Sequence, residues 1–145
     1  MQRDLVFSFV TAVIATVGLA LVVPGCGGGS WAYQVVGSSR DPGAEGTIQV
    51  ERIEGGNRLV TATLLHMTPP ERLGQNNTVY VMWFRDPRGH STKASVLEYD
   101  AGSRTARATA TTPMTTFMIQ VTAERNGQVV EPSENVIFSQ RANTQ

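Results

Sequence analysis

Residues 45–140 alternate apolar and polar side chains with a period of two, and this pattern limits the fold more than any other feature. The clearest run is residues 115–124, in which Phe117, Ile119 and Val121 alternate with polar neighbours. Successive side chains of a β-strand point to opposite faces, so the run predicts a strand with one buried face. The region therefore predicts strands and no amphipathic helix, whose period would be about 3.6 residues.

Turn-forming residues divide this region into short segments. Gly55-Gly56 and Asn126-Gly127 favour tight hairpins, and Asp86-Pro87-Arg88-Gly89 fits a type I turn. We expect strands at residues 47–53, 59–67, 78–85, 95–99, 105–111, 115–124 and 135–139. About seven antiparallel strands predict an all-β, immunoglobulin-like β-sandwich, with closure into a small barrel as the alternative.

Residues 78–85 are apolar on both faces of the expected strand. The two faces hold Val79, Val81 and Trp83, and Tyr80, Met82 and Phe84, respectively. Such a strand is usually central in its sheet, so we expect Trp83 in the core. The two faces of one strand cannot be equally deep in a small sandwich, so Tyr80 and Phe84 are candidates for a recognition surface. With Arg88 and His90 in the next turn, they form the expected partner contact.

The first uncharged stretch, residues 5–23, predicts an apolar signal helix long enough to cross a bilayer core of about 30 Å. It ends in Val23-Pro24-Gly25-Cys26 and is followed by three glycines. This segment resembles the lipobox of bacterial lipoproteins, in which an aliphatic residue and small residues precede a cysteine. The resemblance implies cleavage after Gly25 and lipid attached to the Cys26 thiol; Pro24 departs from the usual pattern. The alternative is an uncleaved membrane helix beside a free thiol.

These observations predict four parts of the chain. We expect a signal peptide at residues 1–25, a lipidated cysteine with a flexible tether at 26–44, the sandwich at 45–140 and a disordered tail at 141–145. Trp31, Tyr33 and Val35 leave open a leading strand within the tether. The lipobox resemblance implies the cell envelope. The residue after Cys26 is not aspartate, which resembles the pattern of lipoproteins routed to the outer membrane; this resemblance implies a place there, facing the periplasm or the cell surface.

Three short motifs of the mature region also resemble a known family. Tyr80-x-x-Trp83, Val121-Thr122-Ala123-Glu124 and Glu131-Pro132-Ser133 are similar to the extracytoplasmic sandwich domain of RskA-like anti-sigma factors. The similarity covers residues 77–138. Those regulators carry a sigma-binding domain before their membrane segment, whereas residues 1–4 alone precede the apolar run here. The resemblance therefore implies the fold, not control of a sigma factor.

The residues that could carry chemistry are few and scattered. Lys and Arg number 12 and Asp and Glu number 12, so the balanced charge argues against a nucleic-acid partner. His66 and His90 lack metal-ligand spacing, and His90 shares one short turn with Asp86, where a catalytic triad would need partners from separate elements. We expect neither an enzyme, nor a metal site, nor a cofactor.

The leading hypothesis is a non-catalytic module of the cell envelope that binds a protein, a peptide or a glycan. Its expected contacts are Tyr80, Phe84, Arg88 and His90, with the membrane reached through lipid on Cys26. An envelope-stress sensor related to anti-sigma domains is the alternative. A hydrolase, the third hypothesis, would need a concave site that gathers His66 or His90 with acidic residues.

Overall fold

The computed structural model describes residues 28–145, so the expected signal helix and Cys26 lie outside the described residues. The regular secondary structure of the described chain is β-strand, apart from two short 3-10 turns, η1 (Glu54–Gly56) and η2 (Pro70–Arg72). The strands are β1 (Ser30–Val36), β2 (Glu45–Arg52), β3 (Arg58–Leu65), β4 (Val79–Arg85), β5 (Ser91–Val96), β6 (Glu98–Asp100), β7 (Thr105–Thr112), β8 (Thr116–Glu124) and β9 (Val136–Asn143).

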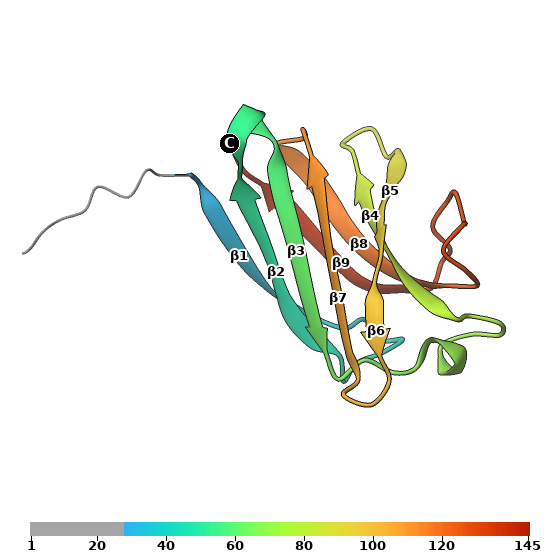
Figure 1. Cartoon of the computed structure of the whole chain (residues 1–145). Coiled ribbons are helices and arrows are strands. Elements are labelled where there is room, and N and C mark those ends of the chain that lie inside the picture. The colour runs from blue at the N-terminus through green and yellow to red at the C-terminus, as the bar shows by residue number, and fades with distance from the viewer. Residues whose placement is uncertain (1–27) are drawn as a thin grey trace, which may run out of the picture.

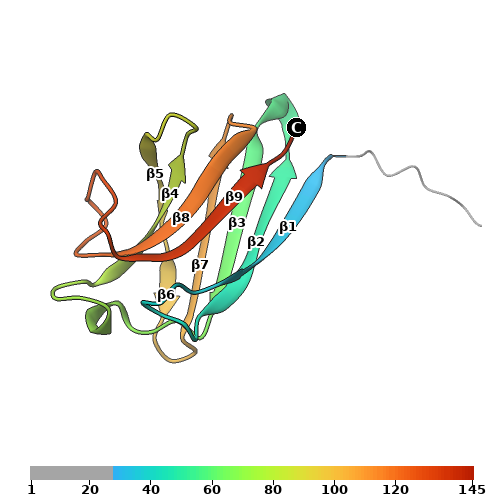
Figure 2. The same cartoon turned by 180° about the vertical axis from the view of Figure 1, so that it is seen from behind.

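The strands form two antiparallel sheets that stack face to face (Figures 1 and 2). The first sheet has the order β1-β2-β3-β7-β6, and the second has the order β5-β4-β8-β9. Apart from the additional edge strands β1 and β5, this connectivity is that of a seven-stranded immunoglobulin-like sandwich. The predicted fold class is confirmed, and the two sheets remain separate instead of closing into a barrel.

The inward-facing side chains of both sheets make one apolar core. Ile48, Val60 and Leu64 of the first sheet face Met82 and Ile119 of the second, and all five are fully buried. Two edge-to-face aromatic pairs add to this packing. Phe84 and Phe117 have ring centroids 5.3 Å apart, and Tyr80 and Tyr99 have centroids 5.6 Å apart. Such pairs contribute about 0.5–1.5 kcal/mol beyond their buried area.

The expected flexible tether at residues 26–44 is wrong from Gly29 onward. β1 pairs with β2 along its whole length, from Ser30 opposite Glu51 to Val36 opposite Glu45. The Gly29 carbonyl also accepts a hydrogen bond of 2.8 Å from the Arg52 amide. Alternating Trp31, Tyr33 and Val35 face the core, which is why this short segment adds a strand in spite of the turn residues that follow it.

The expected disordered tail at residues 141–145 is also wrong. β9 continues to Asn143, where it pairs with Thr116, and Ala142 is fully buried. The next residue, Thr144, accepts two hydrogen bonds from the buried Arg58. The Arg58 Nε donates to the Thr144 hydroxyl at 2.7 Å, and the Arg58 Nη2 donates to the Thr144 carbonyl at 3.0 Å. Polar residues at a chain end look like a fraying tail in the sequence, but here they satisfy a buried cation.

The segment expected as one strand at residues 95–99 belongs to both sheets. β5 ends at Val96 in the second sheet, and β6 begins at Glu98 in the first. Leu97 lies between them, is buried, and donates its backbone N–H to the Tyr80 carbonyl at 2.9 Å. The chain therefore changes sheets at one buried residue.

A bend at residues 66–68, after β3, gathers hydrogen bonds from several elements. The Tyr80 hydroxyl donates to the Thr68 carbonyl, and the Tyr99 hydroxyl donates to the Met67 carbonyl at 3.3 Å. The Arg104 guanidinium donates to the carbonyls of both His66 and Met67. Since these carbonyls have no strand partner, the tyrosine and arginine side chains replace the missing ladder bonds.

The two tyrosines predict a loss of stability in alkali. Burial is the main cause that raises the pKa of Tyr80 and of Tyr99 above the usual value of about 10. Since the folded pKa exceeds the unfolded pKa, this contribution is complete below about pH 10 and is lost as the pH rises through the folded values. We expect the urea midpoint to fall above about pH 10, and to fall less in Tyr80→Phe. An equal alkaline fall in that variant would contradict the assignment.

Candidate functional site

A basic depression lies on the outer face of the second sheet, at the end that carries the β4–β5 loop. Arg85 of β4 stands opposite Met118 of β8, which in turn stands opposite Arg141 of β9. Their strand neighbours Phe84, Phe117 and Ala142 point into the core, so these three side chains share the outer face. Together with Arg88 of the loop they line an open depression of about 420 Å³.

The loop above this depression is a closed turn. The Gly89 N–H donates to the Asp86 carbonyl at 3.0 Å, which confirms the predicted turn, and Gly89 takes a positive φ of 94°. The His90 N–H donates to the Asp86 carboxylate at 2.9 Å, and the imidazole lies 3.3 Å from its other oxygen. The backbone bond from His90 is the main cause that lowers the pKa of Asp86. Asp86 therefore holds the loop together as a carboxylate.

The three arginines of the depression keep most of their hydrogen-bonding capacity. Within residues 28–145, no Lys or Arg lies within 4.0 Å of a carboxylate, so no acidic residue neutralises Arg85, Arg88 or Arg141 directly. Arg85 donates once, from Nε to the Gly89 carbonyl at 3.1 Å. A guanidinium has five N–H donors in a planar fork that matches carboxylates and phosphates. The arrangement is suited to holding an anion.

Of the four residues expected to contact a partner, two are on the surface and two are not. Arg88 and His90 are exposed in the β4–β5 loop, as expected from the turn. Tyr80 is fully buried and Phe84 is 4% exposed, because both face the opposite sheet and pack on Tyr99 and Phe117. The expectation that Tyr80 and Phe84 form a contact surface is therefore wrong.

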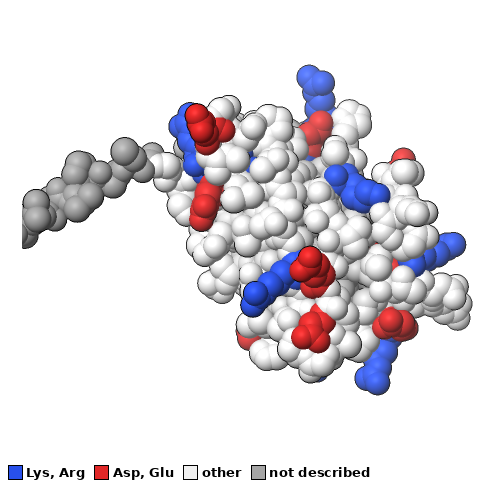
Figure 3. Space-filling model, viewed as in Figure 1, with Lys and Arg blue, Asp and Glu red and all other residues white. Residues whose placement is uncertain are grey.

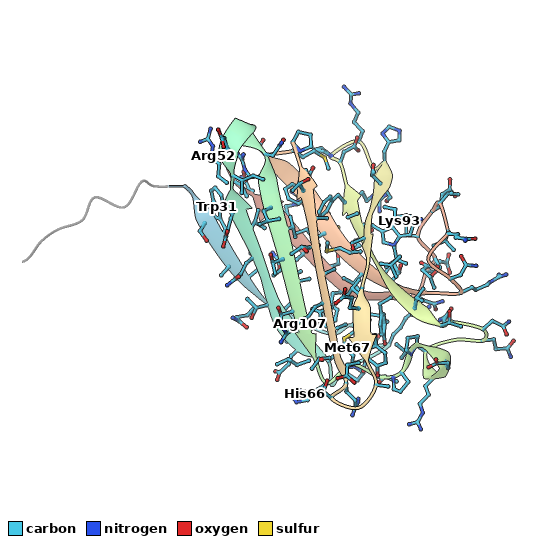
Figure 4. All side chains as sticks on the ribbon, in the orientation of Figure 1. Trp31, Arg52, His66, Met67, Lys93 and Arg107 are labelled. Carbon is cyan, nitrogen blue, oxygen red and sulfur yellow. The ribbon has the colours of Figure 1, made fainter. Side chains whose placement is uncertain are left out.

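Trp83 is buried as expected, but on the outer face of the second sheet, outside the main core cluster. Its indole N–H donates to the Thr122 hydroxyl at 2.8 Å, which donates to the Glu124 carboxylate at 2.6 Å. The same carboxylate accepts the Ser133 N–H at 2.8 Å. These bonds hold the segment between β8 and β9 against the second sheet. Figure 4 shows Lys93 close to this segment.

Lys93 links the strand beside Trp83 to the segment between β8 and β9. It stands opposite Trp83 on the neighbouring strand, and its ammonium donates to the carbonyls of Gly127 at 2.7 Å and Val129 at 3.1 Å. A second depression, of about 550 Å³, lies between β5 and β7 with Phe84 and Lys93 in its lining. The Lys93 ammonium already donates to two carbonyls. This depression therefore offers a ligand less free charge than the basic depression lined by Arg85, Arg88 and Arg141, which we call the arginine site.

The histidines are held apart by the fold. His66 follows β3 at one end of the sandwich and lies 3.3 Å from Glu45, whereas His90 lies at the other end beside Asp86. Figure 4 shows His66 and Met67 at the end opposite Trp31 and Arg52. Within residues 28–145 there is no group of three or more His, Cys, Asp or Glu side chains that could hold a metal. The gathering of histidine and acids that the hydrolase hypothesis requires is not found among these residues.

Sequence reasoning identified Arg88 and His90 but missed Arg85 and Arg141. These two arginines are 56 positions apart in the chain, and only the registers of β4 with β8 and of β8 with β9 bring them to one row. A polar residue on the open face of a strand is ordinary, so neither position carries a signal by itself.

Comparison with known proteins gives no relative: no protein-family model, curated protein or solved structure matches this chain. In the described part of the chain, no helix has the length and apolar character needed to cross a membrane.

Proposed function

We propose that this chain is a non-catalytic binding module of the cell envelope, held at a membrane by lipid on Cys26. The main support is the arginine site, in which three guanidiniums that have no carboxylate partner within residues 28–145 surround an open depression on the second sheet. Arg85 and Arg141 project from strands, and Arg88 projects from a loop that Asp86 fixes. A site on rigid elements loses little conformational entropy on binding. The ligand class is anionic.

The lipid anchor is supported by the sequence around Cys26, which follows an apolar stretch and the small residue Gly25 and precedes three glycines. Gly29 is already hydrogen-bonded to Arg52, so Gly27 and Gly28 alone separate the cysteine from the sandwich. We propose the outer membrane, with the domain facing the periplasm or the cell surface. Two or three acyl chains attach a protein durably, whereas one chain binds only marginally.

Cys26→Ser tests the anchor. We expect this variant to move from the membrane fraction to the soluble fraction and to lose incorporated fatty acid, because serine offers no thiol. Ser30→Ala, an exposed change at the start of β1, should leave both properties unchanged. The intact mass of the native protein should lack residues 1–25 and include acyl groups. Membrane retention of Cys26→Ser with residue 1 still present would instead support the uncleaved helix.

A further inference from the structure

We propose that the arginine site binds the anionic lipid headgroups of the same membrane that holds the anchor. This inference rests on the proposed function, because it takes Cys26 as the point of attachment. It deepens that proposal by naming the anion as a headgroup phosphate of the bilayer, and it gives the domain a fixed orientation on the membrane.

The fold places the chain entry and the arginine site at the same end of the sandwich. β1 starts at this end, as do β3 at Arg58 and β8 at Thr116, whereas β4 and β9 finish there. In Figures 1 and 2 the start of β1, the marked C-terminus and the β4–β5 loop all lie at the upper end. A domain attached through β1 therefore turns this end, with Arg85, Arg88 and Arg141, toward the bilayer.

The attachment is short, and Gly29, where it joins the domain, is packed. Three residues from Cys26 to Gly29 span at most about 11 Å. A side chain added at Gly29 would place its Cβ 2.5 Å from the ring of Trp31, so the backbone lies tight against the indole. Gly29 also accepts from Arg52, which fixes its position. The domain cannot move far from the surface, so the arginines meet the surface potential, which decays over about 8 Å at physiological ionic strength, whenever this end lies against the bilayer.

The charges at the two ends differ in arrangement. At the arginine corner, three exposed guanidiniums accompany one carboxylate, Asp86, whose oxygens already face His90. The same end also carries the exposed Glu51 and Glu54 near the start of β1, so its positive charge is concentrated at this corner. Figure 3 shows basic atoms projecting from the upper end with acidic atoms below them, and basic and acidic atoms together at the upper left. The opposite end carries exposed carboxylates among its arginines, namely Glu45, Glu71, Glu98, Asp100, Glu131 and Glu134. An anionic surface would attract the arginine corner more strongly than it would attract the opposite end, where carboxylates stand among the arginines.

The depression fits a headgroup in chemistry as well as charge. Arg85 and Arg141 flank Met118, so a phosphate between the guanidiniums would sit over an apolar thioether. Bidentate bonding to oxyanions favours arginine over lysine at such a site. Each basic residue near an anionic leaflet shifts the equilibrium between docked and undocked domains by about fivefold.

Energy transfer from the domain to labelled headgroups tests this orientation. Cys26 is the only native cysteine, and a lipidated thiol does not react with a thiol-reactive dye. An introduced cysteine is therefore the only labelled position. Thr92→Cys places a dye at the arginine end, and Ala101→Cys places one at the opposite end; both positions are exposed. The full chain is reconstituted in vesicles of phosphatidylcholine, with or without about 30% phosphatidylglycerol, with acceptor dye on the headgroups.

We expect more transfer from Thr92→Cys than from Ala101→Cys in both membranes, and a further rise at Thr92→Cys with phosphatidylglycerol. Arg85→Gln, Arg88→Gln and Arg141→Gln together should abolish that rise. Arg72→Gln, Arg107→Gln and Arg125→Gln together, the matched control at other exposed arginines, should preserve it. About 1 M salt should also abolish the rise, because the screening length falls to about 3 Å.

The outcomes separate the two proposals. Labelling of the native chain would overturn the anchor at Cys26. Equal transfer from both positions in the anchored chain would overturn the proposed orientation. Two outcomes would overturn the headgroup site alone. In the first, the Thr92→Cys dye shows more transfer than the Ala101→Cys dye, but phosphatidylglycerol does not raise it. In the second, phosphatidylglycerol raises the transfer even after the triple substitution. If soluble polyglutamate changes the Thr92 signal through the three arginines while phosphatidylglycerol does not, the site binds acidic protein segments and the lipid assignment is wrong.

Discussion

Deletion of residues 141–145 is expected to destabilise the domain by about 3–5 kcal/mol, because it leaves a buried cation without its partners. Arg58 is 3% exposed, and Thr144 supplies two of its three hydrogen bonds, the third going to the Gly56 carbonyl. The same deletion removes Ala142 from the core and the bonds from Thr144 to the Thr115 carbonyl. The measurement is the urea midpoint, followed by tryptophan fluorescence.

Arg58→Met isolates the contribution of the charge. Methionine keeps an extended apolar side chain but needs no partner, so the deletion should cost clearly less in this background than in the native chain. Removal of Gln145 alone, which is exposed, should have little effect. An equal cost of the deletion in both backgrounds would mean that lost apolar packing, not the orphaned guanidinium, explains the destabilisation. No cost at all would mean that the terminal residues fray as the sequence suggested.

Period-two alternation was sufficient to predict the sandwich, since every strand expected between residues 45 and 140 overlaps an observed one. The alternation did not predict order in segments that are short or that have few inward-facing apolar side chains. β1 has three inward side chains between glycines and a turn, and its pairing with β2 decides its conformation. The end of β9 holds one inward alanine, and its order depends on Arg58, which lies 86 positions away from Thr144.

The candidate site was predictable only in part, for a related reason. Turn chemistry placed Arg88 and His90 at the surface, because a type I turn between strands exposes its side chains. The choice between the two faces of β4 could not be made from the sequence, since both are apolar. The segment between β8 and β9 covers Trp83, so this face is buried without joining the main core, and Tyr80 and Phe84 take the inner face.

Asp41→Ala is expected to destabilise the fold by about 3 kcal/mol, although the residue lies in the segment that the sequence marked as a tether. Asp41 is 4% exposed, and its carboxylate accepts the Thr68 N–H at 2.8 Å and the Thr68 hydroxyl at 2.9 Å. Alanine would leave both half-buried Thr68 donors without this partner, at the bend whose Thr68 carbonyl accepts the Tyr80 hydroxyl. Asp41→Asn keeps one oxygen acceptor and should cost about half as much.

Glu45→Ala provides the matched control at a neighbouring acidic residue. Its carboxylate lies 3.3 Å from His66, but both side chains are more than half exposed, so the change should cost less than about 1 kcal/mol. A flexible tether predicts that neither substitution alters the urea midpoint. A large effect of Asp41→Ala with a small effect of Glu45→Ala would require residues 37–44 to be folded against the 66–68 bend. In that case the chain from Gly29 onward is part of the domain, which is the condition for a short, orienting attachment at Cys26.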